Sequence, residues 1–440
     1  MAQSRGGAVT SLRASPDERK GREQSAFLQA QGSSTRARAP GAAGAKLTCH
    51  PGAVDAKGPS GSAQPSPGCS AGASGGRRPG AAGGTYDGPY VYQDIVVQEP
   101  ALGGKTTRQY VVLEPASLKG PLPLLLWFHG QGGSGIGDAE GWANVTGLAA
   151  CAEANNFLMV LPSGLDDYLN ETVTAYGPDN PDGVESNNGL NNLGSGWNVG
   201  AGGDEKTCIT SKDKTGNLQN ATETLYACYS SCVKLKQCGR CNWSTCHDDL
   251  AFVKALLSHL ADTYCLDLSR IYVGGESNGG MFTHYLSQEL PSTFASFLPI
   301  FALPLLGYSS GKTGQMLRHG EKLAESAFIT YHDRQDAIIP MDGGAATDLG
   351  WAWYYTPLDA VVQAWSGIHE CSAVPTDLNL DFPATDSWKC VEHTGCKSTK
   401  KVVKCLYDGS HGSFPQKGAD GNTAFWFFNQ FRRQSPATWS

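Results

Sequence analysis

The chain has 440 residues, of which 40% are hydrophobic and 17% charged, and it carries a formal net charge of −7. This length and apolar content suffice to bury a large core. Residues 1–83 contain 11 basic and 4 acidic side chains, whereas the remainder contains 23 basic and 37 acidic ones. The acidic balance of the remainder argues against a nucleic acid as its substrate. No apolar run reaches the ~18 residues of a membrane-spanning helix, so no span is expected.

Residues 1–83 differ in composition from the rest of the chain. They are dominated by Gly, Ala, Ser, Pro and Arg and show almost no apolar periodicity. Such a segment buries too little apolar surface to offset the entropy of ordering it, so we predict a disordered, low-complexity segment. The stretch from Met1 to Pro40 also lacks the apolar centre of a secretory signal. Residues 84–440 are expected to form one globular domain.

Apolar and amphipathic segments alternate in this domain. Short, almost continuously apolar runs, such as 123–129 and 157–162, predict strands buried on both faces of a parallel sheet. Apolar residues spaced by three and four predict a helix over 248–264. Further strands are expected at 93–97, 109–113, 270–276, 297–306, 327–331 and 401–406, with helices at 278–288 and 422–432. The alternation predicts an α/β fold with a doubly wound, mostly parallel sheet.

One long segment, about 166–247, breaks this alternation. It is rich in Gly and Asn and then in cysteine, and it is expected to form an insertion over the functional face of the sheet. Twelve of the 14 cysteines lie in 84–440, and they predict disulfides and a secreted protein. Four N-glycosylation triplets point the same way, at Asn144, Asn170, Asn220 and Asn242. Zinc is the alternative for the CxxC at 238–241, but the second half of a zinc ribbon is missing, so no metal is expected.

The strongest chemical signal is the pattern G-x-S-x-G at residues 275–279. An apolar strand precedes it and a helix-compatible run follows, which is the context of a nucleophile at a sharp strand-to-helix turn. A Gly-rich turn without chemistry is the alternative reading. Ser277 is therefore the expected nucleophile of an α/β-hydrolase fold.

A serine nucleophile needs a base and an orienting carboxylate, which in this fold follow it in the order acid, histidine. His411 comes directly after the last predicted strand and is the expected base. Asp333 and Asp336 both follow the strand at 327–331, and spacing alone does not choose between them. Asp408 is a weaker rival, expected to be a turn residue.

Backbone N–H groups are expected to stabilise the oxyanion of the reaction. One should come from Asn278, directly after the nucleophile, and another from Gln131 in the Gly-rich loop after the strand at 123–129. Trp197, within the insertion, is a candidate for the substrate pocket, with packing in the core or lid as the alternative.

The ordered motifs resemble the family of secreted esterases that includes feruloyl esterases and polyhydroxybutyrate depolymerases. The similar blocks are 124–135, 196–202, 248–257, 264–281, 332–340 and 408–415. The resemblance aligns Asp336 with the acid of a His-Gly-x-x-Asp motif, in which this chain has Asp333 in place of the glycine. Phe414 likewise replaces a tryptophan of the block that contains the histidine.

This resemblance implies hydrolysis of a carboxylic ester through an acyl-enzyme, with Ser277, Asp336 and His411 as catalytic residues and no cofactor. The expected substrate is an aromatic or polymer-linked ester, most simply a feruloyl ester of a cell-wall polysaccharide. A polyester depolymerase is the alternative, although no flanking segment resembles a polymer-binding module. A catalytically silent binding protein and a serine peptidase of the same fold are further alternatives.

Overall fold

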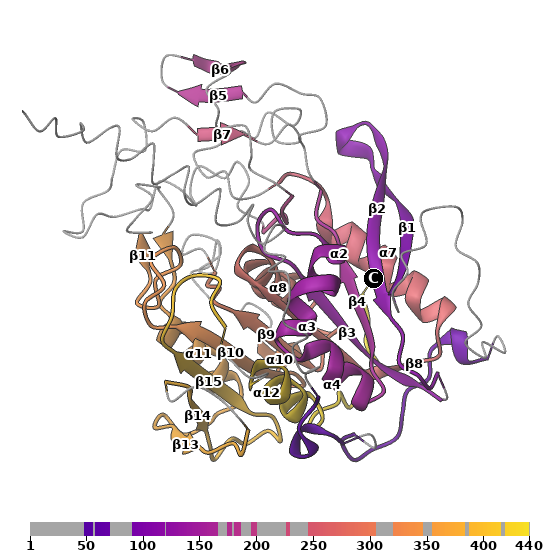
Figure 1. The fold of residues 1–440 in the computed structure, drawn as a ribbon, viewed down its shortest axis with the longest axis vertical. Helices are drawn as coiled ribbons and strands as arrows, with labels where there is room; N and C mark the ends of the chain where they lie inside the picture. Colours follow the sequence, from indigo (N-terminus) through magenta and orange to yellow (C-terminus); the bar gives the residue numbers. More distant parts are fainter. Residues whose placement is uncertain are drawn as a thin grey trace, which may run out of the picture. The chain divides into compact units, whose positions relative to one another are not determined.

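The computed structural model describes a unit that spans Gly44–Ser440 (Figure 1). Within it the described residues are 48–55, 58–70, 90–118, 120–165, 174–177, 180–185, 195–199, 226–228, 245–304, 320–345, 354–382, 387–414 and 419–439. Most of the predicted insertion therefore lies outside the described residues. The backbone of three short strands is described within it, and they form a small sheet in the order β6-β5-β7.

A ten-stranded sheet forms the centre of this unit, in the order β1-β2-β4-β3-β8-β9-β10-β15-β14-β13. Six strands, from β4 to β15 in that order, run parallel, and antiparallel strands complete both edges. The strands are β1 (Tyr90–Glu99), β2 (Gly104–Leu113), β3 (Leu122–Phe128), β4 (Leu158–Pro162), β8 (Leu266–Glu276), β9 (Ser296–Ile300), β10 (Ala327–Asp333), β13 (Thr376–Leu378), β14 (Lys389–His393) and β15 (Val402–Tyr407). The mostly parallel sheet expected from the alternating pattern is confirmed.

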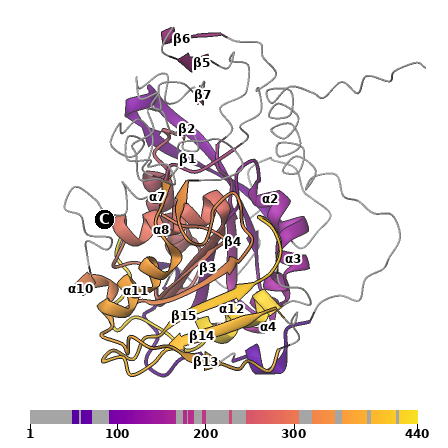
Figure 2. The same cartoon turned by 90° about the vertical axis from the view of Figure 1, so that its left-hand side faces the viewer.

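Helices cover both faces of the sheet (Figure 2). Those on one face are α7 (Asp249–Thr263), α8 (Ser277–Glu289), α10 (Gly320–Leu323) and α11 (Leu358–Ile368). Those on the other are α2 (Gly135–Gly137), the π-helical turn η5 (Asp138–Trp142), α3 (Ala143–Val145), α4 (Leu148–Ala154) and α12 (Ala419–Phe428). The short 3₁₀ turns are η2 (Pro51–Ala53), η3 (Pro67–Cys69) and η4 (Pro100–Leu102), and the small strands are β5 (Thr174–Gly177), β6 (Asn180–Glu185), β7 (Tyr226–Cys228), β11 (Gly344–Ala345) and β12 (Tyr354–Tyr355).

The fully apolar strand β3 shows why two helical layers are needed. Successive side chains of a strand point to opposite faces. Leu124, Leu126 and Phe128 belong to the core beneath α7 and α8, whereas Leu125 and Trp127 belong to the core beneath α4 and α12. All five are fully buried. At roughly 1.5–3 kcal/mol for each large apolar side chain, burial on both faces accounts for the absence of polar residues in this strand.

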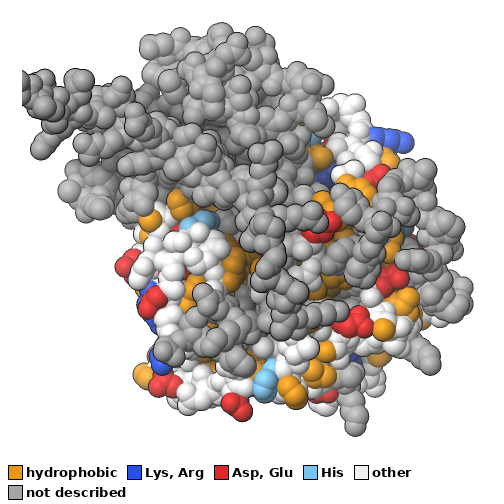
Figure 3. Space-filling model, viewed as in Figure 1, with side chains coloured by type: hydrophobic (Ala, Val, Ile, Leu, Met, Phe, Trp, Pro, Cys, Tyr) orange, Lys and Arg blue, Asp and Glu red, His pale blue; other side chains and the backbone are white. Residues whose placement is uncertain are grey.

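The described part of the face shown in Figure 3 carries hydrophobic side chains and charges of both signs. The hydrophobic side chains alternate there with separate acidic and basic groups. In the part of the chain that the structure describes, no helix is long and apolar enough to cross a membrane.

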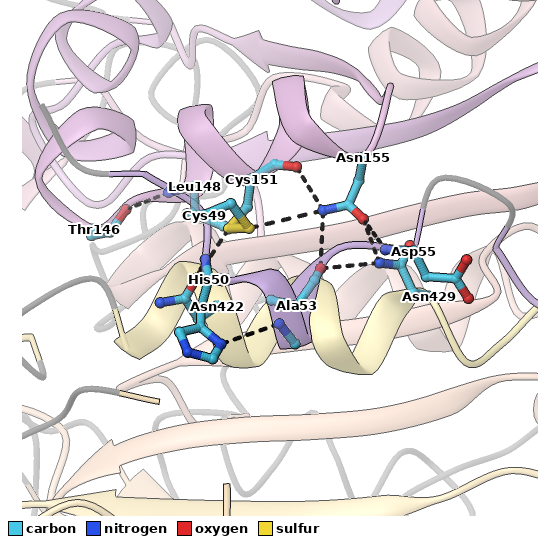
Figure 4. The surroundings of a disulfide bond; sticks show 11 residues. Cys49, His50, Ala53, Asp55, Thr146, Leu148, Cys151, Asn155, Asn422 and Asn429 are labelled. Carbon is cyan, nitrogen blue, oxygen red and sulfur yellow. Dashed lines mark hydrogen bonds between the residues drawn. A yellow bond between two sulfur atoms is a disulfide. The ribbon is translucent and has the colours of Figure 1, made fainter. Parts of the chain in front are cut away.

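The prediction that residues 1–83 lie outside the globular unit is wrong for the described residues 48–55 and 58–70. A disulfide joins Cys49 to Cys151 of α4 (Figure 4). Next to it, the Asn155 side chain donates to Ala53 O at 3.0 Å and accepts from Asp55 N at 2.8 Å. This asparagine is 1% exposed, so the segment covers a buried polar group of the domain.

A second attachment lies at the start of β8. Cys69 forms a disulfide with Cys265, and Pro65 pairs with Asp267 in an isolated antiparallel bridge. The Ser66 hydroxyl donates to a backbone carbonyl at 2.9 Å and is 2% exposed. The composition of residues 1–83 did not predict these contacts. A few cysteines and hydrogen-bonding groups hold the described part of the segment, and they require no large apolar surface.

Candidate active site

Ser277 stands at the turn between β8 and α8. Its φ is +48°, a left-handed conformation that is unfavourable for any residue with a side chain. The turn is tight enough that a Cβ on Gly279 would lie 2.1 Å from Phe128 O and 2.5 Å from His129 O. The glycine therefore lets α8 approach the end of β3. The hydroxyl group is left at the C-terminal edge of the sheet, and the residue is 8% exposed.

Three of the residues that the sequence singled out lie in a hydrogen-bonded row. Ser277 Oγ lies 2.9 Å from His411 Nε2, and His411 Nδ1 lies 2.8 Å from Asp336 Oδ2. They follow β8, β15 and β10, three strands whose C-terminal ends meet at one edge of the parallel sheet. Ser277 and His411 are 134 residues apart in the sequence, and His411 and Asp336 are 75 residues apart. The parallel arrangement of the strands brings them together.

The carboxylate of Asp336 is held from its other side. Its Oδ1 accepts hydrogen bonds from Ile338 N at 2.9 Å and Ile339 N at 2.8 Å. His332 is packed beside it, with Nε2 2.8 Å from Ile339 O. Burial lowers the pKa of His332, which favours the neutral ring with its proton on Nε2. Asp336 is 5% exposed, so its orientation is fixed by these contacts.

The two rival aspartates do not reach the histidine ring in this arrangement. Asp333 is fully buried, and its Oδ1 accepts from Gln335 N and Gly409 N. Asp408 forms an exposed ion pair with Arg334 at 2.8 Å. The hydrogen-bonding pattern thus separates the three carboxylates that sequence spacing left in competition.

The loop after β3 lies against the serine. A Cβ on Gly130 would be 3.4 Å from Ser277 Cβ, so Gln131, the next residue, belongs to the wall beside the hydroxyl. The fully buried His129 holds this loop: its Nε2 accepts from Gly164 N at 2.8 Å, and its Nδ1 lies 2.6 Å from Gly130 O. Burial lowers the His129 pKa to about 4, so the ring is neutral and its single proton lies on Nδ1.

Trp197 is fully buried, and its ring stacks on Phe282 at a centroid distance of 5.3 Å. Its indole N–H donates to His129 O at 2.9 Å, and its backbone N–H donates to Asn278 Oδ1 at 2.7 Å. These contacts favour the packing role that the sequence left open over a substrate-contact role. The tryptophan connects the loop after β3 with the first turn of α8.

Sequence reasoning missed a pair of carboxyl groups beside the nucleophile. Glu276 precedes Ser277 and accepts from Gly130 N at 3.3 Å. Burial raises its pKa to about 8, and burial together with the nearby Glu276 raises the pKa of Asp138. Asp138 comes from η5, which no motif marked. An acidic residue at the variable position of G-x-S-x-G was the only available signal.

Aromatic side chains also flank the histidine, and the sequence analysis gave them no role. Phe301 packs edge-on against His411 at 5.1 Å and contacts Phe414 at 5.0 Å. Phe414 in turn packs edge-on against Trp142 at 4.3 Å. Phe301 is buried, whereas Trp142 and Phe414 are partly exposed. Phe301 therefore restricts the movement of the imidazole by direct packing.

The cysteines whose side chains the structure describes are all disulfide-bonded. Four disulfides are described, the two above together with Cys371–Cys396 and Cys390–Cys405. Cys246 is also disulfide-bonded. The described residues contain no group of three or more side chains suited to hold a metal ion.

Comparison with known proteins gives a distant relationship. No family model matches the chain. A curated relative, probable feruloyl esterase C of Aspergillus niger, is 21% identical over 168 residues, which cover 38% of this chain and 52% of that protein. The match thus spans about half the length of the relative. It confirms the resemblance to feruloyl esterases that the ordered motifs predicted.

Solved structures give a similar picture at low similarity. An acetyl xylan esterase from Aspergillus awamori is 13% identical, with 77% of this chain and 99% of that chain covered and a TM-score of 0.42. A ferulic acid esterase is 14% identical, with 77% and 95% covered and a TM-score of 0.37. The class is defined by the chain's own topology: a mostly parallel sheet with a strained serine at a strand-to-helix turn is an α/β-hydrolase fold.

Proposed function

We propose that this chain is a serine carboxylester hydrolase that works through an acyl-enzyme. The observation that carries the proposal is the row Ser277–His411–Asp336, with contacts of 2.9 and 2.8 Å at the C-terminal edge of the sheet. A nucleophile, a base within proton-transfer distance and a carboxylate on the far ring nitrogen are the groups that acyl transfer requires.

In the proposed reaction, Ser277 Oγ attacks the ester carbonyl carbon while His411 Nε2 takes the hydroxyl proton. The imidazolium then donates this proton to the leaving alkoxide, which departs as an alcohol and leaves the acyl group on the serine. Water repeats the sequence, with His411 as base, and releases the carboxylic acid. Asp336 accepts a hydrogen bond from Nδ1–H throughout, so it fixes the ring tautomer and stabilises the imidazolium.

The backbone N–H groups of Gln131 and Asn278 are the proposed donors to the oxyanion. Support comes from the closeness of the Gly130 Cα region to Ser277 Cβ and from the position of Asn278 in the first turn of α8. The start of a helix adds a partial positive charge there. Loss of one such donor typically costs about 3–4 kcal/mol of transition-state stabilisation.

The proposed substrate class is a feruloyl-type ester of a cell-wall polysaccharide. The resemblance to probable feruloyl esterase C supports it, and the match covers about half of that protein. The partly exposed aromatic rings of Trp142 and Phe414 near the histidine are compatible with a flat aromatic acyl group. Secretion is part of the proposal, because disulfides such as Cys371–Cys396 persist in oxidising compartments.

Activity of the purified chain on methyl ferulate and on a polyhydroxybutyrate film tests the proposal. We expect hydrolysis of the soluble aromatic ester, and a loss of about 10⁴-fold or more in Ser277→Ala. A fluorophosphonate probe should label the wild type and leave Ser277→Ala unlabelled. Preference for the film would favour the polyester alternative, and failure of both activity and labelling would favour a catalytically silent binding protein.

A further inference from the structure

The turn that carries Asp336 and the turn that carries His411 come from different strands. Asp336 follows β10 and His411 follows β15, and these two strands pair in parallel up to the register Asp333–Tyr407. Beyond that register the sheet no longer fixes the spacing of the two turns. Some other contact must therefore hold the carboxylate and the imidazole at 2.8 Å.

Asp333 supplies such a contact. Its Oδ1 accepts a hydrogen bond of 2.7 Å from Gln335 N, the residue before Asp336. The same oxygen accepts a hydrogen bond of 3.0 Å from Gly409 N, two residues before His411. One oxygen atom thus joins both turns.

Burial makes this bridge more effective than a surface contact. Asp333 is 0% exposed, and its Oδ2 has no hydrogen-bond partner among the described residues. Both hydrogen bonds are part-buried, and leaving a buried carboxyl oxygen without its partners is costly. A second link between the turns, Arg334 with Asp408, has side chains that are 32% and 50% exposed.

We propose that Asp333 is a positioning residue that sets the Asp336–His411 distance by accepting one backbone hydrogen bond from each turn. The resembling motif has glycine at this position, so the bridge is a property of this chain's own sequence. The inference rests on the proposed function for its kinetic consequences. Its structural consequence, the environment of the His411 ring, is independent of any substrate.

Two substitutions at this position separate the hydrogen bonds from the charge. Asp333→Asn keeps an acceptor oxygen for Gln335 N and Gly409 N and replaces the unpartnered Oδ2 with an amide nitrogen. Asp333→Ala removes both hydrogen bonds. Arg334→Ala is the matched control, because it removes the exposed link between the same turns, and such surface pairs contribute little.

The first measurement is the NMR signal of the proton on His411 Nδ1, recorded at a temperature where every variant is folded. We expect Asp333→Ala to shift this signal upfield, because the hydrogen bond from Nδ1 to Asp336 Oδ2, 2.8 Å long in the wild type, lengthens. Asp333→Asn and Arg334→Ala should stay near the wild type. His332 and Asp336 are the other titratable groups on this turn, and they remain in all three variants.

The second measurement is ester hydrolysis. Asp333→Ala should lower kcat by roughly 10–100-fold with little change in KM, and it should slow fluorophosphonate labelling by a similar factor. An unchanged Nδ1 proton signal of His411 in Asp333→Ala, with only a lower melting temperature, would overturn the proposal and leave a purely structural residue. Equal damage by Asp333→Asn would also overturn it. An inactive wild type would refute the proposed function, while the NMR result would still decide the role of Asp333.

Discussion

The disulfide between Cys49 and Cys151 offers a quantitative test of how the N-terminal segment is held. It closes a loop with a sequence separation of 102 residues. In the chain-entropy description, this restricts the unfolded chain by about 16 cal/mol/K, equivalent to about 4.7 kcal/mol at 25 °C. Replacing both cysteines with serine should therefore remove up to about 4.7 kcal/mol of unfolding free energy.

The bond between Cys371 and Cys396 is the matched control, because its sequence separation is only 25 residues. The same relation gives about 3.5 kcal/mol for this loop, about 1.2 kcal/mol less than for the longer one. The Cys49/Cys151 variant leaves the hydrogen bonds of Asn155 with Ala53 and Asp55 in place. The difference between the two double-serine variants therefore isolates the effect of loop length.

Urea unfolding of the wild type and the two double-serine variants measures these free energies, with calorimetry as a second readout. The Cys49/Cys151 variant should melt roughly 10–20 °C below the wild type. A smaller loss in this variant than in the Cys371/Cys396 variant would refute the reasoning. It would mean that the hydrogen bonds of Asn155, rather than the covalent link, hold the segment.

Two further predictions concern the turn that carries the nucleophile. Burial raises the Glu276 pKa from 4.5 to about 8. Between these two pH values the unfolded chain has lost the Glu276 proton and the folded chain still holds it. The free energy of unfolding should therefore fall as the pH rises from 4.5 to 8. Glu276→Gln should reduce this fall by about 1.4 kcal/mol for each unit of pKa shift. Urea unfolding of the wild type and the variant at pH 5 and 8 measures the fall. An equal fall in both proteins would contradict the prediction. Gly279→Ala places a methyl group 2.1 Å from Phe128 O. This overlap should lower kcat for ester hydrolysis by at least tenfold and also lower the melting temperature. Wild-type values of both quantities would show that the turn can move freely.

The sequence by itself determined the elements that depend on local pattern. Alternating apolar runs identified β3 and the strand before Ser277, and the spacing of apolar residues identified α7. Asp248 precedes the first residue of that helix, and its side chain accepts from Ala251 N at 2.8 Å. These signals are local because backbone geometry and one buried face impose them on consecutive residues.

Tertiary structure decided which polar residues meet. Asp333 and Asp336 are three positions apart and have similar neighbours in the sequence. Only the parallel pairing of β10 with β15 turns Asp336 toward the histidine and Asp333 toward the backbone of both turns. The sequence likewise predicted disorder for residues 48–70, because the two cysteines and the few hydrogen-bonding groups that hold this segment form no periodic pattern. Distant contacts of this kind follow from chain topology, which brings together groups that no window of sequence contains.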